Sequence, residues 1–233
     1  MQEKTFTHGC FITLEGIEGA GKSSLVEALC QLCKERGLSA VSVREPGGTA
    51  IAEQIRSILK TKQEEKLTSE AELLLMYAAR AQLVNTVIRP ALAQGKVVIC
   101  DRHDLSTRAY QGGGRGFSLE TIAKVRSVAL GDFKPDLTLL IDVPPELGLK
   151  RAALREALTG VEVNDRFESE KLSFFERVRS EYLKAYHEDS KVYARSMLLI
   201  DGTMSMSEVR ELALNAVREL LDRRLSFLEG GRA

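Results

Sequence analysis

The segment with the clearest chemical meaning is Gly16-Ile17-Glu18-Gly19-Ala20-Gly21-Lys22-Ser23. It fits the phosphate-loop pattern G-x-x-x-x-G-K-S/T, in which glycines let successive backbone N–H groups turn onto phosphate oxygens. Lys22 adds a full positive charge, the following helix start adds about half a unit, and the Ser23 hydroxyl suits Mg²⁺. The segment therefore predicts a nucleotide phosphate site that also holds a divalent cation.

Three arginines occupy positions where a second phosphate would be bound. Arg80 shares a helical face with apolar residues, so it needs an anionic ligand or a structural salt bridge. Arg102 follows a buried run that ends in Asp101, which places it over the carboxyl edge of a sheet. Arg56 lies on the helix after the loop that contains Glu45, and a solvated helix arginine is its alternative interpretation. Together these cations favour a phosphorylated acceptor.

Predicted strands and helices alternate along the chain. Short apolar runs predict strands at 10–14, 40–43, 97–101, 137–142 and 197–200. Helical periodicity predicts helices around 25–33, 51–59, 69–95 and 209–220. Ser69-x-x-Glu72 has the form of a capping box and predicts the start of the helix 69–95. Pro90 is expected to kink that helix. The order favours an α/β fold with a doubly wound sheet of about five parallel strands, helices on both faces and a ligand crevice at the carboxyl ends of the strands.

Length and composition favour one globular unit. We expect a single domain over residues 1–233, with the charged stretch 150–171 as a lid and 225–233 as a loose tail. Hydrophobic residues make up 44% and charged residues 28%, which excludes a disordered tail protein. Lys plus Arg and Asp plus Glu are 33 each, so no overall charge draws the chain onto nucleic acid or a membrane.

The sequence also bears on the compartment. No apolar run reaches the ~20 residues of a membrane span, and the N-terminus has no apolar stretch like that of a signal peptide, so we expect a cytoplasmic protein. Four cysteines are too few for a disulfide scaffold, and we expect them to be reduced. Cys30-x-x-Cys33 lacks the second pair of a zinc site.

A phosphate loop alone leaves kinases, GTPases and ATPases open. The second half of the chain has no Asn-Lys-x-Asp or Thr-Lys-x-Asp segment to read guanine, and no Leu-Ser-Gly-Gly signature of a transporter ATPase. Five segments, in order between about residues 10 and 220, resemble the bacterial thymidylate kinases of the nucleoside monophosphate kinase group. They are the phosphate loop 16–23, Arg44-Glu45-Pro46-Gly47-Gly48-Thr49, Tyr77-Ala78-Ala79-Arg80, Asp101-Arg102-His103 and Ala109-Tyr110-Gln111-Gly112-Gly113.

The resemblance implies that the γ-phosphoryl group of ATP moves to dTMP, giving ADP and dTDP for dTTP biosynthesis. It further implies a homodimer and roles for the donor side of the site. Residues 16–23 would bind ATP, with Lys22 on its β- and γ-phosphates. Ser23 and Asp101 would arrange Mg²⁺, and Glu18 would lie near the metal or the acceptor sugar. Because Glu18 would repel two phosphates, we expect it to have a cationic or metal partner.

The acceptor side follows from the same resemblance. Arg102 would bridge the two phosphates, Arg56 and Arg80 would clamp the dTMP phosphate, and Glu45 with Pro46 would shape the cleft. Gln111 would read the thymine edge, with Thr107 close to it. Many relatives stack a phenylalanine on thymine where this chain has Met76, so either Met76 or Tyr77 is expected to contact the ring. His103, where relatives commonly have tyrosine, is expected to be a scaffold residue.

The catalytic cation is expected to come from the lid. Some thymidylate kinases carry an arginine inside the phosphate loop, but Glu18, Gly19 and Ala20 are not basic. The resemblance then implies a lid arginine, for which Arg151, Arg155 and Arg166 are available and Arg155 or Arg166 is favoured. Asp142 also ends a strand, but Asp101 is preferred as the metal ligand because Arg102 adjoins it.

Two other functions remain open from the residues alone. One is a phosphate-loop kinase for another pyrimidine nucleotide or a deoxynucleoside. A nucleoside acceptor would need a carboxylate base and would leave the pocket arginines without a purpose. The other is a nucleotide-binding switch, which would hydrolyse ATP slowly without preferring any acceptor.

Overall fold

The structure is a computed structural model that describes residues 6, 8–62, 64–159, 166–167, 170–188 and 192–230. The strands are β1 Cys10–Glu15, β2 Ala40–Arg44, β3 Val97–Asp101, β4 Leu137–Asp142 and β5 Met197–Asp201. The helices are α1 Lys22–Glu35, α2 Ala50–Lys60, α3 Ser69–Leu83, α4 Arg89–Ala93, α5 Asp104–Thr107, α6 Leu119–Leu130, α7 Pro145–Thr159, α8 Leu172–His187 and α9 Met206–Gly230, with π-helical segments η1 Val84–Ile88 and η2 Arg108–Gly114.

The five strands form one parallel sheet in the order β2-β3-β1-β4-β5. In its centre Ile12 of β1 aligns with Ile99 of β3 and Leu137 of β4. Every residue of β1 is buried, as expected for a strand covered on both faces. The predicted α/β fold is confirmed, and each predicted strand lies within one residue of its observed bounds. The carboxyl ends of β1, β2 and β3 meet at one edge, where the phosphate loop, Glu45 and Arg102 follow them.

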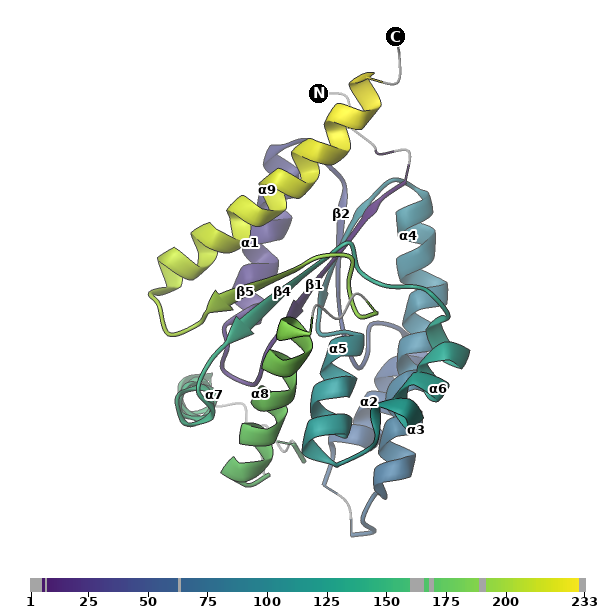
Figure 1. Ribbon diagram of the computed structural model, residues 1–233, viewed down its shortest axis with the longest axis vertical. Helices are drawn as coiled ribbons and strands as arrows, with labels where there is room; N and C mark the ends of the chain where they lie inside the picture. Colours follow the sequence, from purple (N-terminus) through teal and green to yellow (C-terminus); the bar gives the residue numbers. More distant parts are fainter. Residues whose placement is uncertain are drawn as a thin grey trace.

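Helices cover both faces of the sheet (Figure 1). On one face α1 and α9 pack against alternate sheet residues such as Ile12 and Ile99. On the other face α3, η1, α4 and α6 pack on Phe11 and Val98 towards β2, and α8 packs on Leu140 towards β5. The alternation of the β1 side chains between the two layers follows from the two-residue period of a strand.

Several helix boundaries differ from the prediction. The first turn of α3 is capped by Thr68, whose hydroxyl accepts from the Ala71 N–H, so the cap lies one residue before the predicted Ser69. The expected kink before Pro90 takes the form of the π-helical segment η1. The tail expected at 225–233 is mostly helical, because α9 continues to Gly230 and Leu225 still packs on the core; residues 231–233 lie outside the described residues.

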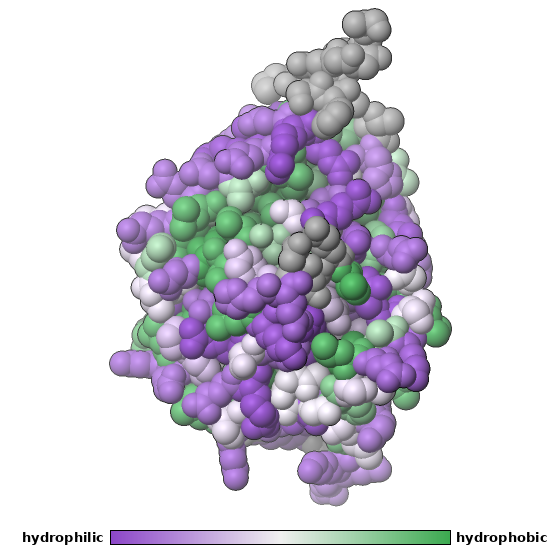
Figure 2. Space-filling view, viewed as in Figure 1, coloured by the Kyte–Doolittle hydropathy of each residue, from purple (hydrophilic) through white to green (hydrophobic). Residues whose placement is uncertain are grey.

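The lid stretch predicted at 150–171 begins inside α7, which starts earlier, at Pro145. Residues 160–165, 168 and 169 lie outside the described residues. Figure 2 shows hydrophilic side chains spread over one face of the molecule, with apolar ones gathered beside α9. Among the described residues, no helix combines the length and the apolar character needed to cross a membrane.

Candidate active site

A cavity of about 360 Å³ opens at the carboxyl edge of β1, β2 and β3. Its size and its position at the strand ends are those of a small-molecule site in an open parallel sheet. Most predicted site residues line it, namely Glu18, Gly19, Ala20, Gly21, Lys22, Ser23, Glu45, Pro46, Arg56, Met76, Arg80, Asp101, Arg102, Thr107, Gln111 and Arg155. The fold therefore brings residues from the first two thirds of the chain into one space.

The phosphate loop joins β1 to α1. Gly19 and Gly21 have φ of 72° and 86°, the left-handed region that favours glycine. Lys22 is buried, and its Nζ donates to the carbonyl oxygens of Gly16 and Ile17 at 3.0 and 2.8 Å. These hydrogen bonds tie the lysine side chain to the first two residues of the loop. Burial, together with the nearby charge of Arg102, lowers the pKa of Lys22 to about 8.

Ser23 and Asp101 lie together, as expected for a magnesium site. Ser23 Oγ is 3.5 Å from Asp101 Oδ2. The other oxygen, Asp101 Oδ1, is buried and has no hydrogen-bond partner among the described residues. A hydroxyl beside an unsatisfied carboxylate oxygen fits Mg²⁺, which takes one or two protein oxygens together with substrate phosphates and water. The described residues contain no cluster of three or more acidic, histidine or cysteine side chains that would hold a metal without such help.

Glu18 has the partner that was expected for it. Its Oε1 accepts from Arg102 Nη2 at 2.8 Å, and its Oε2 accepts from the Tyr110 hydroxyl at 2.6 Å. Burial opposes the charge, but Arg102 and Lys22 together hold the pKa of Glu18 below its usual value. Because both carboxylate oxygens are engaged, the assignment of Glu18 as a metal ligand is weaker than that of Asp101.

Arg102 is held in an unusual backbone conformation. Its φ of 69° lies in the left-handed region, which non-glycine residues rarely adopt. Its guanidinium lies over the Tyr110 ring and 3.4 Å from the hydroxyls of Ser106 and Tyr182. A strained residue that is fixed by several contacts and lines a cavity is typical of a functional position.

Arg80, which was predicted to clamp the dTMP phosphate, is engaged by protein groups in the structure. It is almost fully buried, and all three guanidinium nitrogens donate to protein groups. Nε donates to Glu45 at 2.6 Å, Nη1 to Thr107 at 2.9 Å, and Nη2 to the His103 carbonyl at 3.0 Å. The structural salt bridge that the sequence left open is therefore what the structure contains, and Arg80 braces the cavity wall.

The same network fixes Glu45. Besides Arg80, the Nδ1 of His103 lies 2.7 Å from Glu45 Oε1. Burial opposes ionisation, yet Arg80 and His103 hold the pKa of Glu45 below its usual value. His103 is buried and contacts the Phe11 ring edge-on, in agreement with the predicted scaffold role.

Arg56 remains the best-placed cation on the acceptor side. It lines the cavity, is half-buried, and donates from Nη1 to the Pro46 carbonyl at 2.7 Å. Arg44 and Lys60 line the same side but were not predicted. Their positions had a signal in the sequence, because Lys60 lies one helical turn after Arg56 and Arg44 ends the strand that precedes the Glu45 loop.

The far end of the cavity is lined by Met76, Thr107 and Gln111. Tyr77, the alternative ring contact, does not line the cavity. It is buried on the core side of α3, where its hydroxyl donates to Asp104 at 2.9 Å. Neighbouring helix residues point about 100° apart, so only one of the pair can face the cavity.

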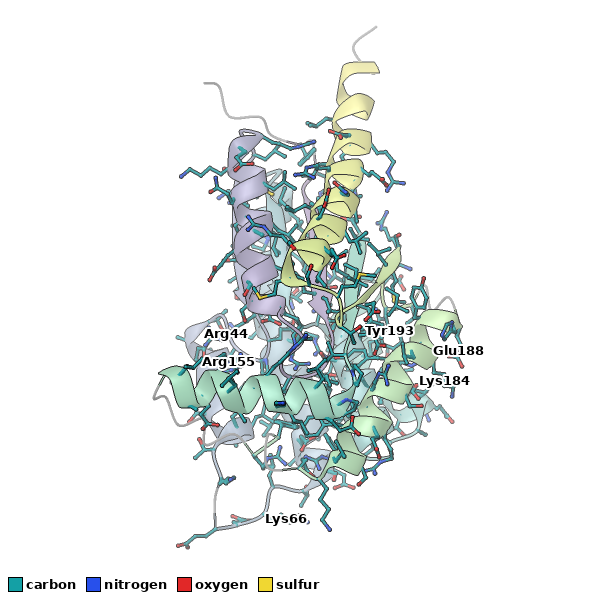
Figure 3. The ribbon with its side chains drawn as sticks, turned by 90° about the vertical axis from the view of Figure 1, so that its left-hand side faces the viewer. Arg44, Lys66, Arg155, Lys184, Glu188 and Tyr193 are labelled. Atoms are coloured by element: carbon teal, nitrogen blue, oxygen red, sulfur yellow. The ribbon has the colours of Figure 1, made fainter. Side chains whose placement is uncertain are left out.

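Of the three lid arginines, Arg155 lines the cavity. Figure 3 shows it on α7 near Arg44. Arg151 donates to the Gly202 carbonyl at 2.9 Å. Arg166, the other favoured lid arginine, donates to the Leu59 carbonyl at 3.1 Å and lies 2.7 Å from Glu72, and its catalytic role stays a prediction. Asp142 pairs with Arg179 at 2.7 Å, which is consistent with the preference for Asp101.

Sequence reasoning missed a buried carboxylate below the site. Glu15, the last residue of β1, is fully buried and accepts from the His103 N–H at 2.8 Å and the Ser106 hydroxyl at 2.5 Å. Burial raises its pKa. Its place in the sequence, at the end of an apolar strand and next to the phosphate loop, could have indicated a buried carboxylate.

Four further residues that line the cavity were also not assigned from the sequence, namely Ser24, Ser106, Tyr110 and Phe167.

The phosphate loop and α7 touch backbone to backbone. A Cβ atom built on Gly19 would lie 1.9 Å from the Gly148 carbonyl oxygen, and one built on Gly148 would lie 2.5 Å from the Glu18 carbonyl oxygen. Real Cβ atoms do not approach so closely, so this contact requires glycine on both sides. It places the first turn of α7 directly against the phosphate loop.

Comparison with known proteins agrees with this geometry. Residues 14–212 match the family model described as thymidylate kinase. A thymidylate kinase of Idiomarina loihiensis is 47% identical over 91% of this chain and 98% of its own, and one of Pseudomonas entomophila is 50% identical over 87% and 91%. A crystal structure of thymidylate kinase from Ehrlichia chaffeensis superposes with a TM-score of 0.69 at 29% identity, covering 91% of this chain and 99% of the other. The chain is therefore a phosphotransferase that belongs to the thymidylate kinase family.

Proposed function

We propose that this chain transfers the γ-phosphoryl group of ATP to dTMP, giving ADP and dTDP, and so supplies dTTP biosynthesis. The observation that carries the proposal is the distribution of cations in one cavity. Lys22 lies at the phosphate loop, Arg56 lies on the acceptor side, and Arg102 follows the strand between them. Two phosphate groups placed end to end would each meet their own cations and share Arg102.

Phosphoryl transfer needs little covalent help from the protein, because positioning and electrostatic stabilisation supply most of the catalysis. The loop N–H groups and Lys22 would hold the donor phosphates. Arg102, oriented by Glu18, would face the transferring group, and Arg155 would reach it from α7. Mg²⁺, held by Ser23 and Asp101, would neutralise part of the phosphate charge when bound. The acceptor phosphate is already ionised, so no general base is assigned.

The acceptor would lie between α2 and α3. Arg56, with Arg44 and Lys60 on the same side, would bind its phosphate. Glu45 and Pro46 would shape the cleft, and Met76 would contact the thymine ring through its sulfur, a contact worth ~0.3–1.5 kcal/mol. Thr107 and Gln111 would contact the edge of the base. Arg80 contributes here by fixing Glu45 and Thr107.

A steady-state comparison of dTMP, dUMP, dCMP and thymidine with MgATP tests the proposal. We expect dTMP to have the highest kcat/KM. A preference for thymidine would overturn the choice of acceptor, because it would leave the acceptor-side cations without a phosphate. Slow loss of ATP at a rate that no acceptor changes would instead support the nucleotide switch.

The proposal includes a homodimer. The apolar stripe of α3 cannot form the dimer interface, because its face, with Leu73, Tyr77 and the adjacent Arg80, is already buried within one chain. Apolar side chains that are exposed on α2 and α3, Ile51, Ile58 and Leu74, offer an alternative surface. Sedimentation analysis of the wild type and of Leu74→Glu tests this, and we expect the variant to shift towards the monomer.

We also propose that the protein works in the cytoplasm. All four cysteines are free thiols, as is usual in a reducing compartment. Fractionation of the producing cells would test the location.

A further inference from the structure

Gln111 makes a buried contact that the proposed reaction does not use. The side chain lines the base end of the cavity and is 1% exposed. Its Nε2 lies 2.7 Å from the Oε1 of Glu72, a fully buried carboxylate in the first turn of α3. A charge is costly to bury unless it is paired and hydrogen-bonded, so this carboxylate needs an explanation.

Two arginines hold Glu72 in place. Arg115 Nε lies 3.2 Å from both carboxylate oxygens, and Arg166 Nη2 lies 2.7 Å from Oε2. Arg166 is itself fixed, because its backbone N–H donates to the Lys60 carbonyl at 2.8 Å. Arg115 also pairs with Glu170, so two arginines and two carboxylates balance in charge here. Glu72 is thus restrained in position by groups that do not line the base end of the cavity.

A restrained carboxylate dictates how the Gln111 amide is oriented. Carboxylate oxygens only accept hydrogen bonds, whereas an amide has a donating NH₂ end and an accepting carbonyl end. The NH₂ end must therefore face Glu72, which leaves the carbonyl end for a base in the cavity. The two ends of a glutamine amide are nearly equal in size, so without Glu72 nothing in this contact would choose between them.

We propose that Glu72 is a positioning residue that sets base selectivity by presenting the Gln111 carbonyl oxygen to N3 of the acceptor pyrimidine. Thymine carries an N3–H donor, which that oxygen accepts. The N3 of neutral cytosine is an acceptor, so the two lone pairs would face each other. A site built to bind a donor rejects an analogue that lacks it, because its own buried polar group is left unpaired. The inference rests on the proposed function and adds a selectivity determinant outside the cavity wall.

The test compares kcat/KM for dTMP with kcat/KM for dCMP in three variants. Glu72→Gln keeps the shape but can both donate and accept, so the Gln111 amide is free to turn over. We expect the dTMP to dCMP ratio to fall by about 10-fold or more, with KM for ATP unchanged. Glu70→Gln, an exposed residue on the same helical turn, is the matched control and should keep the wild-type ratio. Arg115→Gln removes a partner of Glu72 but keeps the carboxylate, so it should lower the melting temperature without changing the ratio.

The outcomes separate this inference from the proposed function. An unchanged ratio in Glu72→Gln, or an equal fall in Glu72→Gln and Arg115→Gln, overturns the positioning role while dTMP kinase activity stands. A wild type that does not phosphorylate dTMP overturns the function itself. If Glu72→Gln does not fold, Gln111→Met tests the step on which the role of Glu72 depends, because it removes the carbonyl and should lower the ratio similarly. A wild-type ratio in Gln111→Met contradicts the proposal.

Discussion

The Arg102 guanidinium lies 2.8 Å from the Glu18 carboxylate, although the two residues follow different strands. β1 and β3 are neighbours in the sheet, so the loops after them meet at the same edge. Arg102 compensates the negative charge of Glu18, because an unpaired carboxylate beside two phosphates would repel both. The pairing also fixes the direction of the Arg102 guanidinium, which in the proposed reaction would contact the transferring group.

Removing that arginine should affect chemistry more than binding. We expect Arg102→Ala to lower kcat by about 10²–10³-fold, the effect of deleting one preorganised transition-state contact, and to change the Kd for MgATP only slightly. Steady-state kinetics with calorimetric ATP binding measure both. Arg218→Ala, on α9 and bonded to Asn215, is the control. Equal losses in kcat and ATP affinity would contradict the role.

The affinity for ATP should depend on pH through Lys22. With a pKa of about 8 the ammonium group is charged below that pH and loses its proton above it. Because phosphate favours the charged form, we expect the affinity for MgATP to fall as the pH rises through about 8, and binding at pH 8 to take up protons. Calorimetry in two buffers with different ionisation enthalpies measures the uptake. Lys22→Arg should bind without it, and the same uptake in both proteins would assign the proton elsewhere.

The magnesium requirement should depend on Asp101. We expect Asp101→Asn to raise the Mg²⁺ concentration for half-maximal activity by about 10-fold or more, because it would remove the negative charge of the proposed metal ligand. A magnesium titration at saturating ATP checks this. Asp142→Asn is the matched control, since Asp142 also ends a strand but pairs with Arg179. A similar shift in both variants would argue against a metal site at Asp101.

The lid arginines should differ in effect. Arg155 lines the cavity, so Arg155→Ala is expected to lower kcat by about 10²-fold or more. Arg151, one turn earlier on α7, donates to Gly202, and Arg151→Ala should keep kcat within a few-fold of the wild type. Single-turnover measurements of the transfer step would compare them, and the reverse order of effects would move the catalytic role to Arg151.

The sheet was predictable from the sequence because parallel strands that are buried on both faces consist of unbroken apolar runs. β3 was predicted with its observed bounds. The phosphate loop, Asp101 and Arg102 were found because they follow such runs directly, so their place at the sheet edge depends on local order alone. The capping of α3 by Thr68 was missed because Thr68 and Ser69 offer the same hydroxyl at successive positions.

The contacts of Arg80, Tyr77 and Arg166 could not be predicted in the same way. Each depends on a partner far along the chain: Glu45, Asp104 and Glu72 respectively. A buried arginine and a phosphate-binding arginine have the same pattern in sequence, since both interrupt an apolar helical face. The two cases differ in whether an acidic side chain from another element lies within hydrogen-bond distance of the guanidinium, and the sequence does not show that distance.

The glycine contact between the phosphate loop and α7 has a mechanical consequence. Arg155 lies seven residues after Gly148, so about 10 Å of helix separates the cation from the point where α7 rests on the loop. A rotation of about 20° around that point carries the Arg155 Cα over roughly 3–4 Å while Gly148 stays in place. Such a rotation would move the arginine without moving the part of α7 that contacts the phosphate loop. A methyl group at position 148 would collide with the Glu18 carbonyl oxygen and so remove this fixed point.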